Sequence, residues 1–189
     1  MTLHLLDFIG FLVGLVYLYL EYRASIWLWL AGVIMPAVDM VLYYRVGLYA
    51  DFGMACYYCL AAAYGFAVWK WGKGGQACEL PVSHFRVRLI LPVTVAFGAL
   101  WWGIRYILVT YTDSTVPTID AFTTALSIVA LWALARKFAE QWLLWFVVDL
   151  VCCWLYIRKG IPFKAAIYGL YTVVALLGYR KWLRMLPEA

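Results

Sequence analysis

Tryptophan and aspartate side chains recur at helical spacing within residues 141–149. Trp142, Trp145 and Asp149 follow an i, i+3, i+7 pattern, which places three side chains on one face of a helix. A carboxylate beside two indole rings suits a flat organic cation, because the carboxylate neutralises charge and the rings attract cations. The structural alternative is that Asp149 pairs with Arg105 or with a tyrosine hydroxyl while the tryptophans form an interfacial belt. We favour binding over this alternative.

The candidate substrate site extends to other polar and aromatic residues of the apolar segments. Its members are Gln141, Trp142, Trp145, Asp149, Trp29, Asp39, Tyr58 and Tyr171. Asp39 lies near the helix face of Trp29 and Pro36, so it provides a second ligand wall, a hinge, or an Asp–Tyr hydrogen bond within the bundle. The two tyrosines either complete an aromatic cage or pack between helices.

The sequence contains none of the residue sets that mark a catalytic or metal site. It has no Ser/His/Asp arrangement, no His/Cys metal spacing and no complete phosphate-binding glycine loop. Cys56 and Cys59 have the spacing of a redox pair, but cysteines in apolar segments usually behave as small hydrophobic residues. We therefore expect neither an enzyme nor a bound cofactor. A membrane redox enzyme that uses the two cysteines is the alternative from another class.

The composition indicates an integral membrane protein. Hydrophobic residues make up 67% of the 189-residue chain and charged residues 13%, whereas soluble domains are nearer to about half and a quarter. A span needs about 20 mainly apolar residues, and it is helical because backbone groups inside hydrocarbon must pair within their own segment. The sequence predicts seven spans, at residues 5–22, 25–44, 49–71, 87–109, 117–134, 141–157 and 162–179.

The distribution of cationic residues predicts how these spans are oriented. Most of the 15 Lys and Arg residues lie at the C-terminus and in loops that follow odd-numbered spans, and cationic loops stay in the cytoplasm. The N-terminus is then outside and the C-terminus inside. The first segment lacks the basic start and cleavage site of a signal peptide, so we interpret it as a span. The cations form no basic stripe for nucleic acid.

An internal repeat relates the two ends of the chain. A shift of 113 residues, from Trp29 to Trp142, aligns residues 4–71 with residues 117–184. Identical pairs include Asp7 and Asp120, Gly65 and Gly178, and Trp69 and Trp182. With a linker helix at 87–109, the two halves face the same way, which predicts one transmembrane domain over residues 1–189 with two parallel repeats. Parallel repeats are a transporter plan in which substrate binds between the halves near the bilayer midplane.

Five sequence motifs resemble the PnuC family of bacterial B-vitamin transporters. They are SIWLWLAG at 25–32, LYYRVGLYAD at 42–51, AYGF at 63–66, EQWLLWFVVD at 140–149 and GYRKW at 178–182. The resemblance covers essentially the whole chain. It implies an all-α fold of seven transmembrane helices in a three-plus-one-plus-three arrangement, like full-length relatives of the SWEET sugar transporters. It also implies a homotrimer in the bacterial inner membrane, in which each protomer has its own site.

The resemblance further implies facilitated diffusion of a vitamin that a cytoplasmic kinase then phosphorylates and traps. Nicotinamide riboside is the founding substrate of the family, and relatives carry thiamine or riboflavin. Members of the nicotinamide riboside type commonly have Asn where this chain has Asp149. Because nicotinamide riboside and thiamine are both cations, the charge does not decide between them, and neutral riboflavin is less favoured beside a carboxylate. We place nicotinamide riboside first and thiamine as the alternative. A third class is a non-transporting assembly or receptor subunit.

Overall fold

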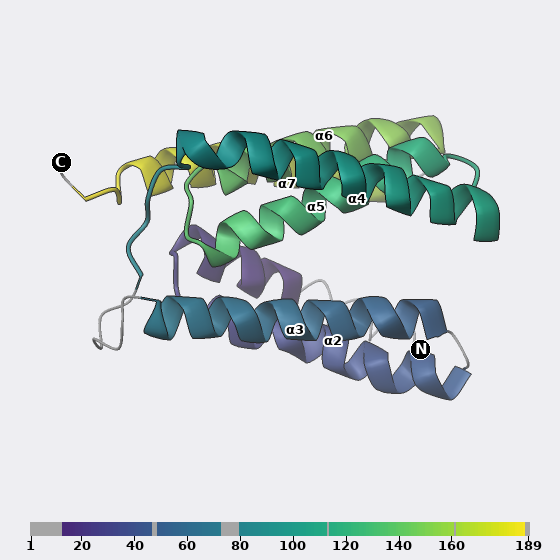
Figure 1. The fold of residues 1–189 in the computed structure, drawn as a ribbon, viewed down its shortest axis with the longest axis horizontal. Coiled ribbons are helices and arrows are strands. Elements are labelled where there is room, and N and C mark those ends of the chain that lie inside the picture. Colours follow the sequence, from purple (N-terminus) through teal and green to yellow (C-terminus); the bar gives the residue numbers. More distant parts are fainter. Residues whose placement is uncertain (1–12, 47–48, 73–79, 113, 161, 188–189) are drawn as a thin grey trace. The chain divides into compact units, whose positions relative to one another are not determined.

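The structure is a computed structural model that describes residues 13–46, 49–72, 80–112, 114–160 and 162–187. The chain divides into two compact units (Figure 1). Unit 1 comprises Met1–Pro81 and Ala135–Lys137, and unit 2 comprises Val82–Leu134 and Phe138–Ala189. In the described part of the chain the secondary structure is helical apart from one isolated bridge between Ser83 and Phe138.

Unit 1 is built from three apolar helices. A first helix covers Val13–Tyr22, α2 covers Trp27–Val46 and α3 covers Tyr49–Trp71. α2 packs along α3, and the helix continues through Pro36, although proline has no N–H to donate to the preceding turn. Both faces of these helices are apolar, which is typical of helices surrounded by lipid and by one another rather than by water.

Unit 2 contains the remaining helices. A short 3-10 turn, η1 (Val87–Leu89), leads into α4 (Ile90–Tyr111), and α5 (Pro117–Ala135), α6 (Gln141–Arg158) and α7 (Pro162–Leu183) follow. Proline is the first residue of both α5 and α7, where its missing N–H costs no helical hydrogen bond. α6 packs along α7, and aromatic contacts from Phe97 and Trp101 to Phe122 join α4 to α5.

The prediction of seven α-helices is confirmed for the described residues, and most boundaries agree within two positions. α7 extends four residues beyond the predicted end at Tyr179, and the predicted start of the first span lies outside the described residues. Among the described residues, four helical segments are long and apolar enough to cross a membrane: Phe52–Trp71, Val87–Tyr111, Pro117–Ala135 and Gln141–Arg158.

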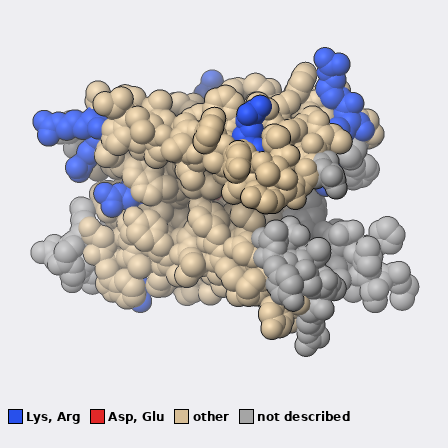
Figure 2. Space-filling view, turned by 45° about the vertical axis from the view of Figure 1, so that its right-hand side comes forward, with Lys and Arg blue, Asp and Glu red and all other residues tan. Residues whose placement is uncertain are grey.

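The surface of the protein is apolar where a soluble protein would be charged. α4 has no buried residue, although its side chains are almost all hydrophobic. On the face in Figure 2, Lys and Arg side chains stand out singly from a described surface that is otherwise uncharged. Monomeric soluble proteins rarely expose continuous apolar surface of this kind, so the structure agrees with a membrane environment.

Two helix ends that lie 113 positions apart have the same backbone geometry. Ala24 and Lys137 both adopt a left-handed conformation, with φ of 51° and 55°. The following residue donates a backbone hydrogen bond to a carbonyl of the last helical turn: Ser25 to Leu20 at 2.9 Å and Phe138 to Ala133 at 3.0 Å. This 6→1 hydrogen bond defines a Schellman ending, here without glycine.

Candidate functional site

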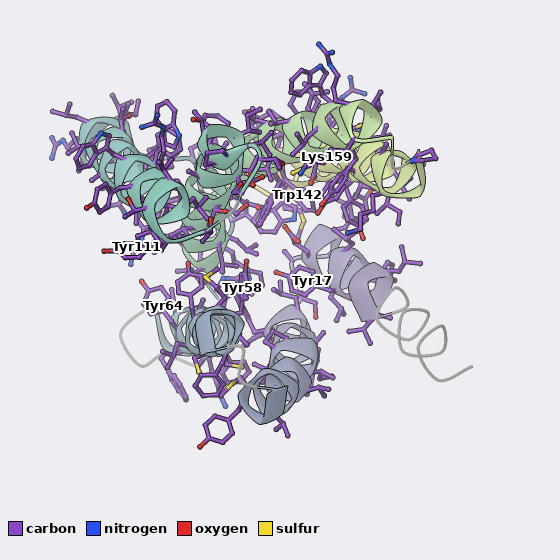
Figure 3. All side chains as sticks on the ribbon, turned by 90° about the vertical axis from the view of Figure 1, so that its right-hand side faces the viewer. Tyr17, Tyr58, Tyr64, Tyr111, Trp142 and Lys159 are labelled. Atoms are coloured by element: carbon purple, nitrogen blue, oxygen red, sulfur yellow. The ribbon has the colours of Figure 1, made fainter. Side chains whose placement is uncertain are left out.

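The N-terminal half of α6 carries most of the predicted site residues, and it is well buried. Gln141 has no exposed surface, Trp142 is 1% exposed and Asp149 is 8% exposed. Because these residues are buried, their polar groups cannot form hydrogen bonds with water. They depend on partners within the protein or on a ligand. Figure 3 shows Trp142 on α6 among the helices of unit 2.

Trp142 lies against α7. Its indole ring covers Gly178, where an added Cβ atom would overlap the ring. The ring also meets Trp182 edge to face, with centroids 5.9 Å apart and an interplanar angle of 88°. Since aromatic pairs prefer this arrangement, Trp142 joins α6 firmly to α7. Its ring is therefore used for packing between the two helices, and the choice between ligand contact and interfacial belt stays a prediction.

Asp149 lies on the same side of α6 as a group of α7 tyrosines. It is close enough to Tyr168 and Tyr171 to interact with them electrostatically, and to Cys152 on its own helix. Tyr168 meets Tyr171 edge to face at 6.0 Å. Among the described residues, Asp149 makes no hydrogen bond and no ion pair. The predicted alternative that Asp149 pairs with Arg105 is wrong. No ion pair joins these two described residues, and Arg105 instead donates through Nε to the Thr118 hydroxyl at 3.1 Å.

Two indole N–H groups of α6 are buried without an acceptor. The Nε1 atoms of Trp142 and Trp145 have almost no accessible surface and no hydrogen-bond partner among the described residues. Buried donors in native proteins are nearly always paired, so an unpaired one requires an explanation. They lie one turn (Trp145) and two turns (Trp142) before the buried carboxylate of Asp149, where such donors are suited to a polar group on a ligand.

Two further residues near Asp149 were not singled out from the sequence. Tyr156 stacks on Tyr168 with centroids 5.3 Å apart and an interplanar angle of 18°. It follows Asp149 by seven positions, so helical spacing could have placed it on the same face. Asp120, on α5, acts electrostatically on Cys152 as Asp149 does, and it accepts a hydrogen bond from the Ser114 hydroxyl at 2.8 Å.

The predicted site residues of the first half of the chain belong to unit 1. Trp29 is 2% exposed and its indole covers Gly65, where a Cβ atom has no room. It meets Trp69 edge to face at 5.6 Å and 89°, and its Nε1 has no described acceptor. The same three residue types therefore make the same contact as in unit 2, each 113 positions earlier.

The other two candidates in unit 1 are less defined. Tyr58, on α3, is 42% exposed and meets Tyr57 edge to face at 5.5 Å (Figure 3). Asp39 lies on α2, and its side chain is outside the described part of the structure. The roles of Asp39 and Tyr58 in binding therefore stay predictions.

The cysteines do not form a redox site in the described structure. Cys56 and Cys59 are both free, and the Cys59 thiol lies 3.7 Å from the Met40 sulfur. No group of three or more His, Cys, Asp or Glu residues within the described ranges is placed to hold a metal ion. α6 and α7 instead bring together one buried carboxylate, two indole N–H groups and several phenol rings, which are groups that can bind a ligand.

The protein has several helices of membrane length, and two of them carry buried polar and aromatic side chains. These features define the class of multi-span membrane proteins that bind small polar molecules. Within this class, the chain belongs to the nicotinamide mononucleotide transporter family, whose model matches residues 4–184. The resemblance to the PnuC family is thereby confirmed. Because this is a family of transporters, the expectation that the chain is not an enzyme is confirmed as well.

Individual relatives support the same assignment. The riboflavin/roseoflavin transporter RibM of Streptomyces davaonensis is 28% identical over 180 residues, which cover 93% of this chain and 83% of that protein. The nicotinamide riboside transporter PnuC of Escherichia coli is 21% identical over 97% of this chain and 87% of its own length. A crystal structure of a vitamin B3 transporter PnuC has the same fold, with a TM-score of 0.67 and 24% identity over 92% of this chain and 78% of that one.

Proposed function

We propose that this protein carries a B vitamin across the bacterial inner membrane by facilitated diffusion, and that nicotinamide riboside is the substrate. The observation that carries the proposal is Asp149, a buried carboxylate beside the α7 tyrosines and one helical turn beyond Trp145. A pyridinium ring has a delocalised positive charge and two flat faces. The carboxylate and the aromatic rings can hold it together, while the sugar hydroxyls can accept hydrogen bonds from the indole N–H groups of Trp142 and Trp145.

We also propose that all seven helices span the membrane, with the N-terminus outside and the C-terminus in the cytoplasm. The two helix triplets at 4–71 and 117–184 are then parallel repeats linked by α4. The matching Schellman endings and the matching tryptophan–glycine contacts support common descent of the two triplets. Transporters with parallel repeats alternate between states open to either side of the membrane, which is the mechanism we propose here.

The homotrimer and the cytoplasmic kinase that traps the vitamin are part of the same proposal. Their support is the family resemblance. Such a trap allows accumulation beyond equilibrium, since a carrier without its own energy source only equalises the electrochemical potential of its substrate across the membrane.

Riboflavin is the second candidate substrate. The relative that transports riboflavin and roseoflavin is more similar in sequence to this chain, at 28%, than the Escherichia coli nicotinamide riboside transporter, at 21%. A neutral isoalloxazine ring can stack on the same indole and phenol rings, but it offers no cation to Asp149. Thiamine keeps its place as a cationic alternative, because its thiazolium satisfies the same carboxylate.

A thermal-shift comparison of the purified protein with nicotinamide riboside, thiamine and riboflavin tests the proposal. A ligand that binds only the folded protein raises the unfolding midpoint in proportion to ln(1 + [L]/Kd). We expect the largest rise with nicotinamide riboside and no rise with nicotinic acid riboside, whose added carboxylate would face Asp149. A larger rise with riboflavin would replace the substrate, and no rise with any vitamin, together with no flux into liposomes, would contradict the transport function.

A further inference from the structure

An apolar groove lies between α4 and α5, within unit 2. Its volume is about 350 Å³. The lining residues are Leu89 from η1, Pro92, Val93, Ala96 and Leu100 from α4, and Ile128, Val129 and Trp132 from α5. Along η1 and α4 the groove runs from Leu89 to Leu100, which is roughly 16 Å at 1.5 Å per residue. This is about half of a hydrocarbon core of roughly 30 Å, so the groove has the length of one leaflet.

The groove opens on a helix that contributes nothing to the interior. No residue of α4 is buried, and Leu91 and Val95, beside the groove residues, are 74% and 62% exposed. At the far end the aromatic contacts of Phe97 and Trp101 with Phe122 hold α4 to α5. An apolar channel that faces hydrocarbon on this scale is suited to an acyl chain.

The other end of the groove is cationic. Arg86 and Arg88 are exposed and stand directly before the first lining residue, Leu89. Neither side chain makes a hydrogen bond or an ion pair with any residue that the structure describes. Unpaired arginines at a membrane surface attract phosphate groups, which they bind with a planar, bidentate donor set.

Glu140, an acidic residue close to this end of the groove, is already engaged. It accepts the Phe85 backbone N–H through Oε2 at 2.8 Å, and its Oε1 lies 2.8 Å from Nδ1 of His84. Both carboxylate oxygens of Glu140 therefore have partners other than Arg86 and Arg88. Phe85 also contacts Trp132, a lining residue of the groove, edge to face with ring centroids 6.3 Å apart. The hydrogen bonds of Glu140 therefore lie next to this end of the groove.

We propose that unit 2 has a specific binding site for an anionic phospholipid, with one acyl chain in the α4–α5 groove and the phosphate at Arg86 and Arg88. The site lies on α4 and α5 and uses none of the candidate vitamin-binding residues. The proposed lipid site can therefore be tested independently of the proposed substrate. The positive charge of the arginines favours a lipid with an anionic headgroup. The length of the groove favours a molecule with an acyl chain over a free phosphate group.

Native mass spectrometry of the purified full-length protein, with phosphatidylglycerol or phosphatidylcholine added, tests this site. At about 1 kcal/mol for each arginine near a membrane surface, the two are expected to favour the anionic lipid by roughly thirtyfold in affinity. The double substitution Arg86→Gln/Arg88→Gln should remove this preference. The control Arg180→Gln/Arg184→Gln removes two exposed arginines at the end of α7 and should keep it. Ala96→Phe fills the groove and should weaken the binding of both lipids by a similar factor.

Three results would overturn the proposal. The first is equal binding of both lipids to the unchanged protein. The second is loss of the preference in both double variants, which would indicate diffuse charge attraction rather than a site. The third is unchanged lipid binding by Ala96→Phe together with dissociation of an oligomer, which would show that a second copy of the chain covers the groove.

Discussion

The indole ring of Trp142 covers Gly178 so closely that a side chain at the glycine has no room. This contact sets how near α6 and α7 approach one another. It also sets the distance from Asp149, two helical turns further along α6, to the tyrosines of α7. The contact of Trp29 with Gly65 has the same geometry in unit 1. Each half of the chain thus uses a large ring and an absent side chain to join two helices.

Gly178→Ala is expected to destabilise the protein. The added methyl group overlaps the Trp142 ring, and overpacking of this kind typically costs about 1–3 kcal/mol. The unfolding midpoint in detergent measures the effect. Gly98→Ala is the matched control, because nothing lies within 4 Å of a Cβ atom there. Because alanine has the higher helix propensity, Gly98→Ala should keep or raise the midpoint; an equal change in both variants would show that the tryptophan contact does not determine the effect.

Lys137 is a buried cation whose replacement should be costly. It is 4% exposed, and its Nζ lies 4.1 Å from the centroid of the Trp69 ring. A desolvated cation–π contact contributes about 2 kcal/mol, so Lys137→Met should lower the free energy of unfolding by about that amount. The exposed Lys159 provides the control, and Lys159→Met should change stability by less than about 0.5 kcal/mol. Equal stability of the two variants would argue that the ring contact contributes little.

Glu140 should protect one backbone amide from hydrogen exchange. The Phe85 N–H donates to the Glu140 carboxylate and to no other described acceptor. Glu140→Ala is therefore expected to speed exchange at Phe85, which hydrogen–deuterium exchange measures directly. His84→Ala removes the other partner of the carboxylate but leaves the amide bond in place, so exchange at Phe85 should stay slow. Slow exchange in both variants would mean that the segment is held in another way.

The indole N–H of Trp145 should contribute to vitamin affinity. Trp145→Phe keeps an aromatic ring but removes the buried donor, which has no acceptor among the described residues. One hydrogen bond is worth about 0.5–1.5 kcal/mol, so Kd should rise about threefold to tenfold. Isothermal titration with the vitamin selected by the thermal-shift comparison gives this value. An unchanged Kd would indicate that the donor faces lipid or another part of the protein.

The helices could be predicted from the sequence because span length and hydropathy follow from the thickness of the bilayer. The bounds of α3 agree with the prediction at both ends. The spacing of Trp142 and Asp149 likewise showed that they share a face of α6. Helical spacing does not show which neighbouring helix that face meets, so the contact of Trp142 with Gly178 on α7 could not be predicted from it.

Other features depend on contacts between segments far apart in the sequence. Arg105 donates to Thr118 rather than pairing with Asp149, and Tyr156 stacks on Tyr168 across two helices. The groove between α4 and α5 could not be predicted from the sequence either, because the sequence of an apolar helix does not show which of its residues remain exposed. These features require the packing of side chains and could not be derived from periodicity.

Flux of labelled vitamin into liposomes that contain the purified protein tests the central claim most directly. The variants are Asp149→Ala, which removes the buried carboxylate, and Trp102→Ala, which removes a 71% exposed ring of α4 outside the candidate site. We expect Asp149→Ala to abolish saturable flux and Trp102→Ala to transport at the rate of the unchanged protein. Saturable flux at the unchanged rate in Asp149→Ala would contradict the central claim.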